Sequence, residues 1–183
     1  GPEIVSLADY RKRYITYKSD RDLQTAHASA PWIVTWDDHE VDNNYASDIP
    51  EDDQTPEQLL LRRAAAYQAF YEFMPIRLPV GRQGTAMPIH RRLRFGRLME
   101  MNVLDTRQYR SDQACGDGRK PSCAEHLDSN RTLLGDAQKN WLYDSLANAD
   151  ATWNVLAQQI MMASLRSLDN EGNELWPMDL WDG

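Results

Sequence analysis

The sequence predicts an α/β fold in one domain. Apolar runs of strand length alternate along the chain with segments that carry helix-start signals, and polar clusters follow two of these runs directly. With 183 residues, 42% of them hydrophobic, the chain is long enough to bury one core. In α/β folds the chemistry is found where strands lead into loops, so the two polar clusters are the first candidates for a site.

The first two helices are predicted from their N-terminal residues. Ser6, with Asp9 three residues later, has the spacing of a capping box, and apolar residues then recur at helical spacing. A shorter second helix is predicted to begin at Asp20 and to end before Pro31, because proline cannot continue a helix.

The third and fourth helices are predicted together with their buried faces. Thr55 as N-cap, Pro56 at the first helical position and Gln58 three residues after the cap predict a helix that runs to about Phe73. Its buried face is expected to contain Leu60, Ala64, Tyr67 and Tyr71. A fourth helix is expected to be capped by Asp136 and to bury Ala137, Trp141, Leu142 and Leu146.

Four strands are predicted from apolar runs. The best candidate for a buried strand is PWIVTW at 31–36. Residues 90–95 and 98–105 are predicted to form a tight hairpin around Gly96 and Arg97. The last predicted strand is 153–157. The segment 106–135 is expected to be irregular. The first and last strands end in polar clusters, Asp-Asp-His-Glu at 37–40 and Gln-Gln at 158–159.

Composition and charge argue against several partners. The net charge of −8 gives no global positive field for nucleic acid or acidic lipid. A cluster of four arginines is interpreted as a solvated strand face, because no exposed aromatic residues are interleaved with it: Arg91, Arg92, Arg94 and Arg97. No run of about 18 apolar residues is present to span a membrane. The sequence does not indicate an oligomeric state.

The two cysteines, Cys115 and Cys123, flank a turn-rich segment. A disulfide between them is the favoured interpretation, and its loop closure would contribute about 2–3 kcal/mol in the chain-entropy model. It would indicate an oxidising compartment. Two unpaired thiols or a weak metal-binding pair are the alternatives.

The cluster at 37–40 contains the residue types needed for chemistry on a charged substrate. Carboxylate oxygens suit hard cations such as Ca²⁺, Mg²⁺, Mn²⁺ or Fe³⁺, and a neighbouring histidine can protonate a leaving oxygen or hold a transferring phosphoryl group. The structural alternative is a capped chain turn, in which the acids accept backbone N–H groups and His39 packs on Trp36. From these residues alone both readings stay open.

Six segments of the chain resemble one family in the same order. WDDHEVDNN at 36–44 is similar to the signature of PhoD-type alkaline phosphatases, which are calcineurin-like metallophosphoesterases. The other five segments are SLADYRKRY from Ser6, LDTRQYR from Leu104, LLGDAQKNWL from Leu133, ATWNVLAQQ from Ala151 and MDLWDG from Met178. The resemblance therefore covers essentially the whole chain.

The resemblance implies roles for the matching positions. Asp38 would be a metal ligand and His39 would contact the leaving group or the phosphate, so both are predicted to be catalytic. Gln159 stands where related enzymes have a metal-binding histidine, and it would either supply an amide oxygen to the metal or hydrogen-bond a bound water. Arg107 would hold a phosphate oxygen of the substrate, or else form a salt bridge with Asp105 or Asp112.

Other residues of these segments are expected to support the ligands. Asp37 and Glu40 are predicted to lie behind them, with Glu40 hydrogen-bonding His39 or a neighbouring backbone group. Asn43, Asn44 and Asp182 are expected to shape loops or make outer contacts. His27, His90 and His126, which lack metal-ligand spacing, are interpreted as structural or solvated.

The resemblance also implies a cofactor and a wider architecture. It indicates a dinuclear metal centre, Fe(III) with Ca(II), in a metallophosphoesterase-type fold whose sheets are flanked by helices, four-layered αββα in the full protein. An upstream Gly-Asp motif and a downstream Gly-Asp-x-His motif of the family have no match here. We therefore expect residues 1–183 to be a single partial domain that is inactive alone.

The expected activity is that of the parent protein. It would be a periplasmic or secreted hydrolase of phosphate monoesters, phosphodiesters or both, whose signal would lie upstream. A non-catalytic phosphoesterase-like binding module is the alternative, and the flanking motifs would discriminate between the two. A calcium-binding loop at 48–53 is weaker, because the glycine and the spacing of an EF-hand are absent.

Overall fold

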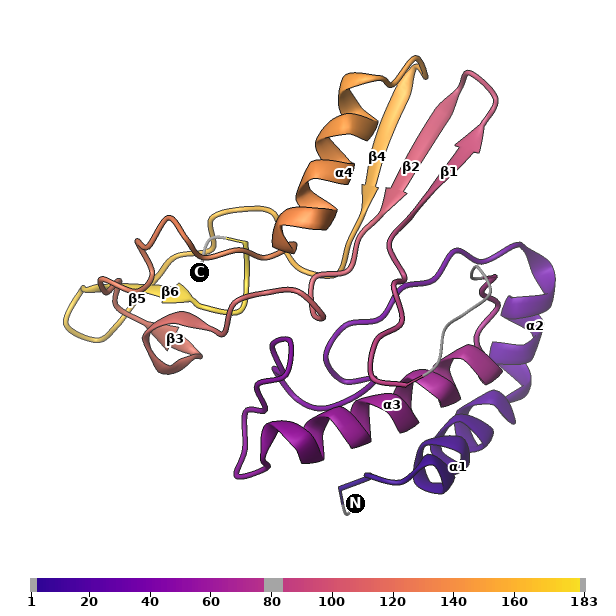
Figure 1. Ribbon diagram of the computed structural model, residues 1–183, viewed down its shortest axis with the longest axis horizontal. Coiled ribbons are helices and arrows are strands. Elements are labelled where there is room, and N and C mark those ends of the chain that lie inside the picture. Colours follow the sequence, from indigo (N-terminus) through magenta and orange to yellow (C-terminus); the bar gives the residue numbers. More distant parts are fainter. Residues whose placement is uncertain (1–2, 78–83, 182–183) are drawn as a thin grey trace.

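The chain forms a group of three helices, a three-stranded sheet backed by a fourth helix, and a second small sheet (Figure 1). The computed structural model describes residues 3–77 and 84–181. Its helices are α1 (Leu7–Lys18), α2 (Arg21–Ser29), α3 (Pro56–Phe73) and α4 (Gly135–Ala147), with a 3-10 turn at Ala114–Gly116. Its strands are β1 (Arg91–Phe95), β2 (Met99–Val103), β3 (Arg119–Lys120), β4 (Trp153–Ala157), β5 (Ser167–Leu168) and β6 (Glu174–Pro177). The predicted α/β class is confirmed.

The helix starts that the sequence predicted for α1, α2 and α3 are confirmed. Both predicted capping boxes form: the Ser6 side chain accepts from Asp9 and the Thr55 side chain from Gln58, and each partner side chain accepts the N–H of its cap residue. Asp20 caps α2. Such caps are local, since they satisfy the free N–H groups of the first turn with nearby side chains. None of the described helices has both the length and the apolar character needed to cross a membrane.

The buried face of α3 differs from the predicted one. Tyr71 is 51% exposed, and the buried residues are Leu59, Arg62, Arg63, Ala66, Tyr67, Ala69 and Phe70. Two arginines join this face because their guanidinium groups have partners. Arg62 pairs with Asp42 and donates to the Tyr10 hydroxyl, while Arg63 donates to backbone carbonyls.

The segment 31–36, predicted as the best buried strand, forms no strand in the described chain. It is extended but half open: Trp32 is 44% exposed, whereas Trp36 is 1% exposed. Side chains hold it in place of a backbone ladder, since Arg91 donates to the Val34 carbonyl and Thr35 to the Leu104 carbonyl. A strand is defined by backbone pairing with a neighbour, so an apolar run alone does not make one.

The three-stranded sheet has the order β1-β2-β4. The hairpin is confirmed, although Phe95 pairs with Met99, so that its loop has three residues and turns at Gly96 with φ +59°. β2 and β4 are parallel, and α4 is the connection between them that lies against the sheet (Figure 1). This unit brings the ends of β2 and β4 to the same edge, close to the segment 31–36.

The predicted face of α4 is wrong in part. Its buried residues are Gln138, Leu142 and Ser145, while Ala137 is exposed. Ser145 lies with its hydroxyl 2.6 Å from Asn102 Oδ1, and Gln138 hydrogen-bonds both backbone groups of Asp105. Polar groups of β2 and of the segment that follows it therefore pair with polar side chains of α4, and these side chains are buried. Asp136 lies in the first turn rather than at the cap, which is Leu134.

The second sheet, with strand order β3-β6-β5, was not predicted, because its strands are only two to four residues long. It includes part of the segment that the sequence indicated as irregular. The predicted disulfide between Cys115 and Cys123 is present next to β3. It ties the chain before β3 to the chain after it.

Candidate functional site

The cluster at 37–40 forms a tight turn at the end of the extended segment. Trp36, just before it, is buried and stacks on Tyr67 with ring centroids 4.1 Å apart. The Asp38 carbonyl then accepts from the backbone N–H groups of Val41 and Asp42, at 2.7 and 2.9 Å. The turn therefore has a rigid base, which is what a site needs to hold its side chains in place.

Asp38 is the most enclosed carboxylate of this turn, with a residue exposure of 5%. Its Oδ2 accepts from the backbone N–H of Asn44 at 2.8 Å. None of the described residues donates a hydrogen bond to its Oδ1, and the Arg107 guanidinium lies 3.9 Å from that oxygen. A buried carboxylate with one open oxygen fits the ligand of a hard cation.

His39 points away from the core. Its side chain is 78% exposed, and its Nε2 lies 3.8 Å from Asp38 Oδ2. Trp36 contacts Tyr67 and Phe70 instead, so the alternative in which His39 packs on Trp36 is not observed. Asp38 and His39 thus place a buried carboxylate and an accessible imidazole side by side, with Oδ2 toward the imidazole and Oδ1 toward Arg107.

The supporting residues divide between the two predicted kinds of contact. Glu40 accepts from the backbone N–H of Asp37 at 2.7 Å, so its partner is the backbone rather than His39. Asn43 donates to the Glu51 carboxylate on the outer side of the loop. Its neighbour Asn44 is the residue that contacts Asp38. Asp182 lies outside the described residues.

Arg107 is fully buried and is held by two carboxylates. Its Nε donates to Asp37 Oδ1 at 2.6 Å, and its two Nη atoms donate to Asp179 at 2.8 and 2.7 Å. The predicted salt-bridge partners, Asp105 and Asp112, are therefore wrong. Asp105 accepts the backbone N–H of Arg107 instead. The bidentate edge that would hold a phosphate oxygen is occupied by Asp179.

Asp179 was not predicted as a site residue from the sequence. It accepts from Arg110 at 2.9 Å and from Gln113 at 2.8 Å, in addition to Arg107. Gln113 also donates to the Asn44 carbonyl, which connects this cluster to the loop that holds Asp38. The only signal in the sequence is that Asp179 and the arginines lie in two family-like segments, and nothing local pairs them.

The two carboxylates on Arg107 have opposite pKa shifts. Burial would raise the pKa of Asp179, but hydrogen bonds and charge from Arg107 and Arg110 outweigh it and hold that pKa below its ordinary value. For Asp37 the burial is larger than the effect of Arg107, and the pKa is raised. The cluster therefore favours the ionised form of Asp179.

The low pKa of Asp179 predicts a loss of stability in acid. A carboxyl whose folded pKa is depressed stabilises the fold above its unfolded pKa of about 4, and the contribution is lost as the pH falls through the folded value. We expect the unfolding free energies of the wild type and Asp179→Asn to differ most above pH 4 and to converge below it. Denaturant titrations from pH 2 to pH 7 measure this, and a pH-independent difference would contradict it.

Gln159 lies at the end of β4 and joins three segments. Its Oε1 accepts from the Thr106 hydroxyl at 3.0 Å, and its Nε2 donates to the Thr35 hydroxyl and the Leu104 carbonyl. These bonds account for its position without a metal. The predicted roles as a metal ligand or as a partner of a bound water stay predictions.

Among residues 3–77 and 84–181, no three His, Cys, Asp or Glu side chains are arranged to hold a metal. The open oxygen of Asp38 fits a metal ligand, with His39 beside it, but further ligands are needed for a stable site. The other histidines make ring contacts: His27 with Trp32, His90 with Trp141 and His126 with Trp176. Arg94 pairs with Asp150 and Arg92 with Glu100.

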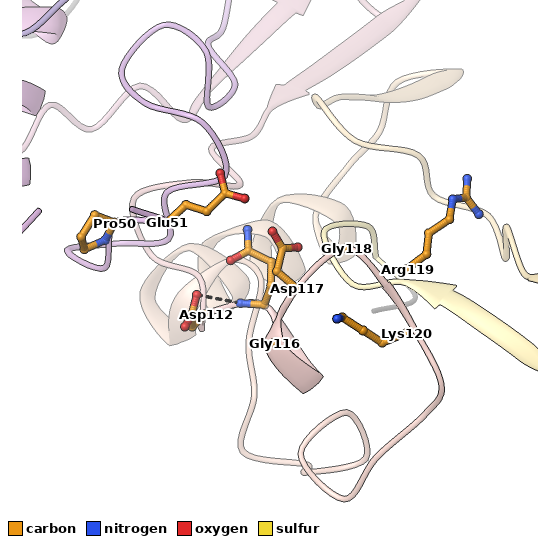
Figure 2. Close-up of a pocket in the computed structure, with 9 residues that line it drawn as sticks. Pro50, Glu51, Asp112, Gly116, Asp117, Gly118, Arg119 and Lys120 are labelled. Atoms are coloured by element: carbon orange, nitrogen blue, oxygen red, sulfur yellow. Dashed lines mark hydrogen bonds between the residues drawn. The ribbon is translucent and has the colours of Figure 1, made fainter. Parts of the chain in front are cut away.

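Two cavities lie near the loop at 36–44. One, of about 340 Å³, has His39 and Glu40 in its wall and is otherwise lined mainly by α1 and α2. The other, of about 620 Å³, is more open and lies beside the disulfide (Figure 2). Figure 2 shows Glu51 and Asp117 at one part of its wall and Arg119 and Lys120 at another. Asn44 links it to the loop by donating to Asp117 at 2.7 Å.

The chain is similar to known proteins over its whole length. The PhoD-like phosphatase family matches residues 1–183. The chain is 52% identical over 181 residues to alkaline phosphatase D of Bacillus subtilis (strain 168), which covers 99% of this chain and 31% of that protein. A solved structure titled "Structure of PhoD" superposes with a TM-score of 0.93 at 51% identity, over 100% of this chain and 35% of the other. The chain thus spans about a third of the length of these relatives.

Proposed function

Because the chain belongs to the PhoD-like phosphatase family, we propose that the full-length protein containing it is a metal-dependent phosphoric ester hydrolase that acts on monoesters, diesters or both. The observation that carries the proposal is the pairing of Asp38 and His39. The carboxylate is buried with one oxygen open, and the imidazole beside it is accessible. The name of the similar Bacillus protein, alkaline phosphatase D, supports the same reaction class.

In the proposed mechanism Asp38 is a ligand and His39 acts on the substrate. Bound metal ions would supply the positive charge that polarises the phosphoryl group and acidifies a water. Asp38 would hold one of them through Oδ1, while its Oδ2 is fixed by Asn44. His39, which is free to reach a substrate, would donate a proton to the ester oxygen as it leaves.

Arg107 is proposed to position the site rather than to bind substrate. Its guanidinium is already paired with Asp37, which precedes the proposed ligand Asp38 in the sequence, and with Asp179. One of its Nη atoms also lies 3.9 Å from Asp38 Oδ1. Arg107 thereby fixes the start of the motif turn. In this arrangement Asp37 and Asp179 pair with Arg107, so we do not propose them as metal ligands.

The metals of the site are proposed to be Fe(III) and Ca(II), on the resemblance described above. A dinuclear centre needs several ligands for each ion, more than Asp38 and His39 supply. We propose that other parts of the full-length protein complete it, with Gln159 as a further candidate from this chain. The disulfide supports a periplasmic or secreted location, since disulfides persist in oxidising compartments.

The proposal is tested by metal analysis and turnover of the purified full-length protein. We expect bound metal, release of inorganic phosphate from a chromogenic monoester or diester, and a loss of turnover on chelation that is reversed by adding the metals back. Chelator-resistant turnover would contradict the metal role. Bound metal without any turnover would favour a binding module of the same fold.

A further inference from the structure

We propose that the cavity between α1, α2 and His39 holds the alcohol part of the ester and that it favours a flat aromatic group. This inference rests on the proposed function, because it assigns the leaving-group side of the same site. It concerns substrate class, which neither the fold nor the motif determines.

The cavity continues from the motif. His39 and Glu40 form part of its wall, and residues from other elements close it: Arg13, Tyr14, Tyr17, Lys18, Leu23 and Met74. The cavity begins beside the proposed metal ligand, because His39, which lines it, has its Nε2 atom 3.8 Å from Asp38 Oδ2. Its volume of about 340 Å³ is within the range of pockets that bind small molecules.

The position of His39 decides which part of the ester enters this cavity. A histidine that donates a proton to the leaving oxygen must lie within hydrogen-bonding distance of that oxygen. With phosphorus on the Asp38 side, the leaving oxygen lies against the imidazole. The rest of the alcohol then extends beyond the imidazole, and the cavity that His39 helps to line offers space for it.

The walls of the cavity favour a flat, apolar group. Tyr14 is held in place by stacking on Phe73, with ring centroids 5.3 Å apart and planes 8° apart. Tyr17 is 59% exposed, and Leu23 and Met74 contribute partly buried apolar surface. Aromatic rings that are already fixed bind another flat ring by stacking without a large entropic cost.

The second cavity is a weaker candidate for the alcohol. Its walls are charged, with Glu51, Asp117, Arg119 and Lys120, and none of the four motif residues at 37–40 lines it. An aromatic alcohol would gain little there, and His39 is not part of the wall of this cavity.

The experiment compares two esters and two matched variants in the metal-loaded full-length protein. Leu23→Trp fills the cavity, and Leu61→Trp makes the same change at a 72% exposed site on α3. We expect Leu23→Trp to lower kcat/KM for naphthyl phosphate by about tenfold or more, the usual effect of blocking an apolar subsite. Methyl phosphate should change by less than about twofold, since it does not reach the cavity, and Leu61→Trp should affect neither ester.

A second variant protects the test against misfolding. Tyr17→Ala removes an exposed wall residue and should also lower kcat/KM for naphthyl phosphate selectively, chiefly through KM. Equal losses for both esters in both variants, or no loss in either, would overturn the inference and leave the phosphatase proposal intact. A wild-type protein that hydrolyses neither of these esters, nor the corresponding phosphodiesters, would overturn both.

Discussion

Arg107→Ala is expected to lower the unfolding free energy by about 2–3 kcal/mol, because it removes a buried guanidinium that is hydrogen-bonded to two partly exposed carboxylates. The Arg107 side chain is 1% exposed, and its Nε and both Nη atoms donate to Asp37 and Asp179. The Asp37 and Asp179 side chains are 36% and 25% exposed, so water can partly hydrate the carboxylates left behind, and the loss is smaller than for a fully buried pair. Denaturation with urea, followed by tryptophan fluorescence, measures the change.

Arg94→Ala is the matched control for this loss. Arg94 also pairs with an aspartate, Asp150, but the two side chains are 47% and 61% exposed. Exposed pairs contribute about 0–1 kcal/mol, so this variant should remain close to the wild type. Similar losses for the two arginines would show that the Arg107 cluster is no more important than a surface pair. Arg107→Lys keeps the charge without the bidentate geometry and should fall between the two.

The features of this fold that depend on residues close in sequence could be predicted, whereas the cluster around Arg107 could not. The helix caps at Ser6 and Thr55, the hairpin turn at Gly96 and the disulfide were predicted because each depends on residues within about ten positions of one another. Asp179 was missed because it lies 72 residues from Arg107, and no local pattern relates them. A lone aspartate near the end of the chain has many possible partners.

The faces of α3 and α4 were misjudged for a related reason. Helical periodicity predicts that apolar residues face inward, yet α3 buries Arg62 and Arg63 and α4 buries Gln138 and Ser145. Each of these polar side chains is satisfied by a partner from a distant segment. Whether a polar residue can be buried depends on that partner, and helical periodicity carries no information about distant partners.

The candidate site was predicted from three separate parts of the sequence, and the structure brings them near one another through contacts that the sequence did not indicate. Asp38 and His39 lie together as expected, while the hydrogen bonds of Gln159 go to Thr35, Thr106 and Leu104. The extended segment 31–36 was read as a strand from its apolar residues, but its neighbours bond to it through side chains. Residues that are close in sequence therefore located this turn, whereas its pairing with neighbouring segments depends on distant partners that local patterns do not contain.

His39→Ala in the full-length protein is expected to lower kcat by about 10²–10⁴-fold for an ester with a poor leaving group, the range typical of a lost general acid. The His39 side chain is 78% exposed, so the variant should keep its stability. Steady-state kinetics with methyl phosphate measure the loss. His126→Ala, a histidine that contacts Ser122 and Trp176 near the disulfide, is the control and should retain wild-type turnover.

The leaving group distinguishes proton donation from any other role of His39. An alcohol of low pKa, such as 4-nitrophenol, departs without a proton, so His39→Ala should cost much less with its phosphate ester than with methyl phosphate. If His39 only oriented the phosphoryl group, both esters would lose the same factor. Leu23→Trp has the opposite pattern, because it penalises the aromatic ester and spares methyl phosphate. Measured together, the two variants separate what His39 does to the leaving oxygen from what the cavity does to the group attached to it.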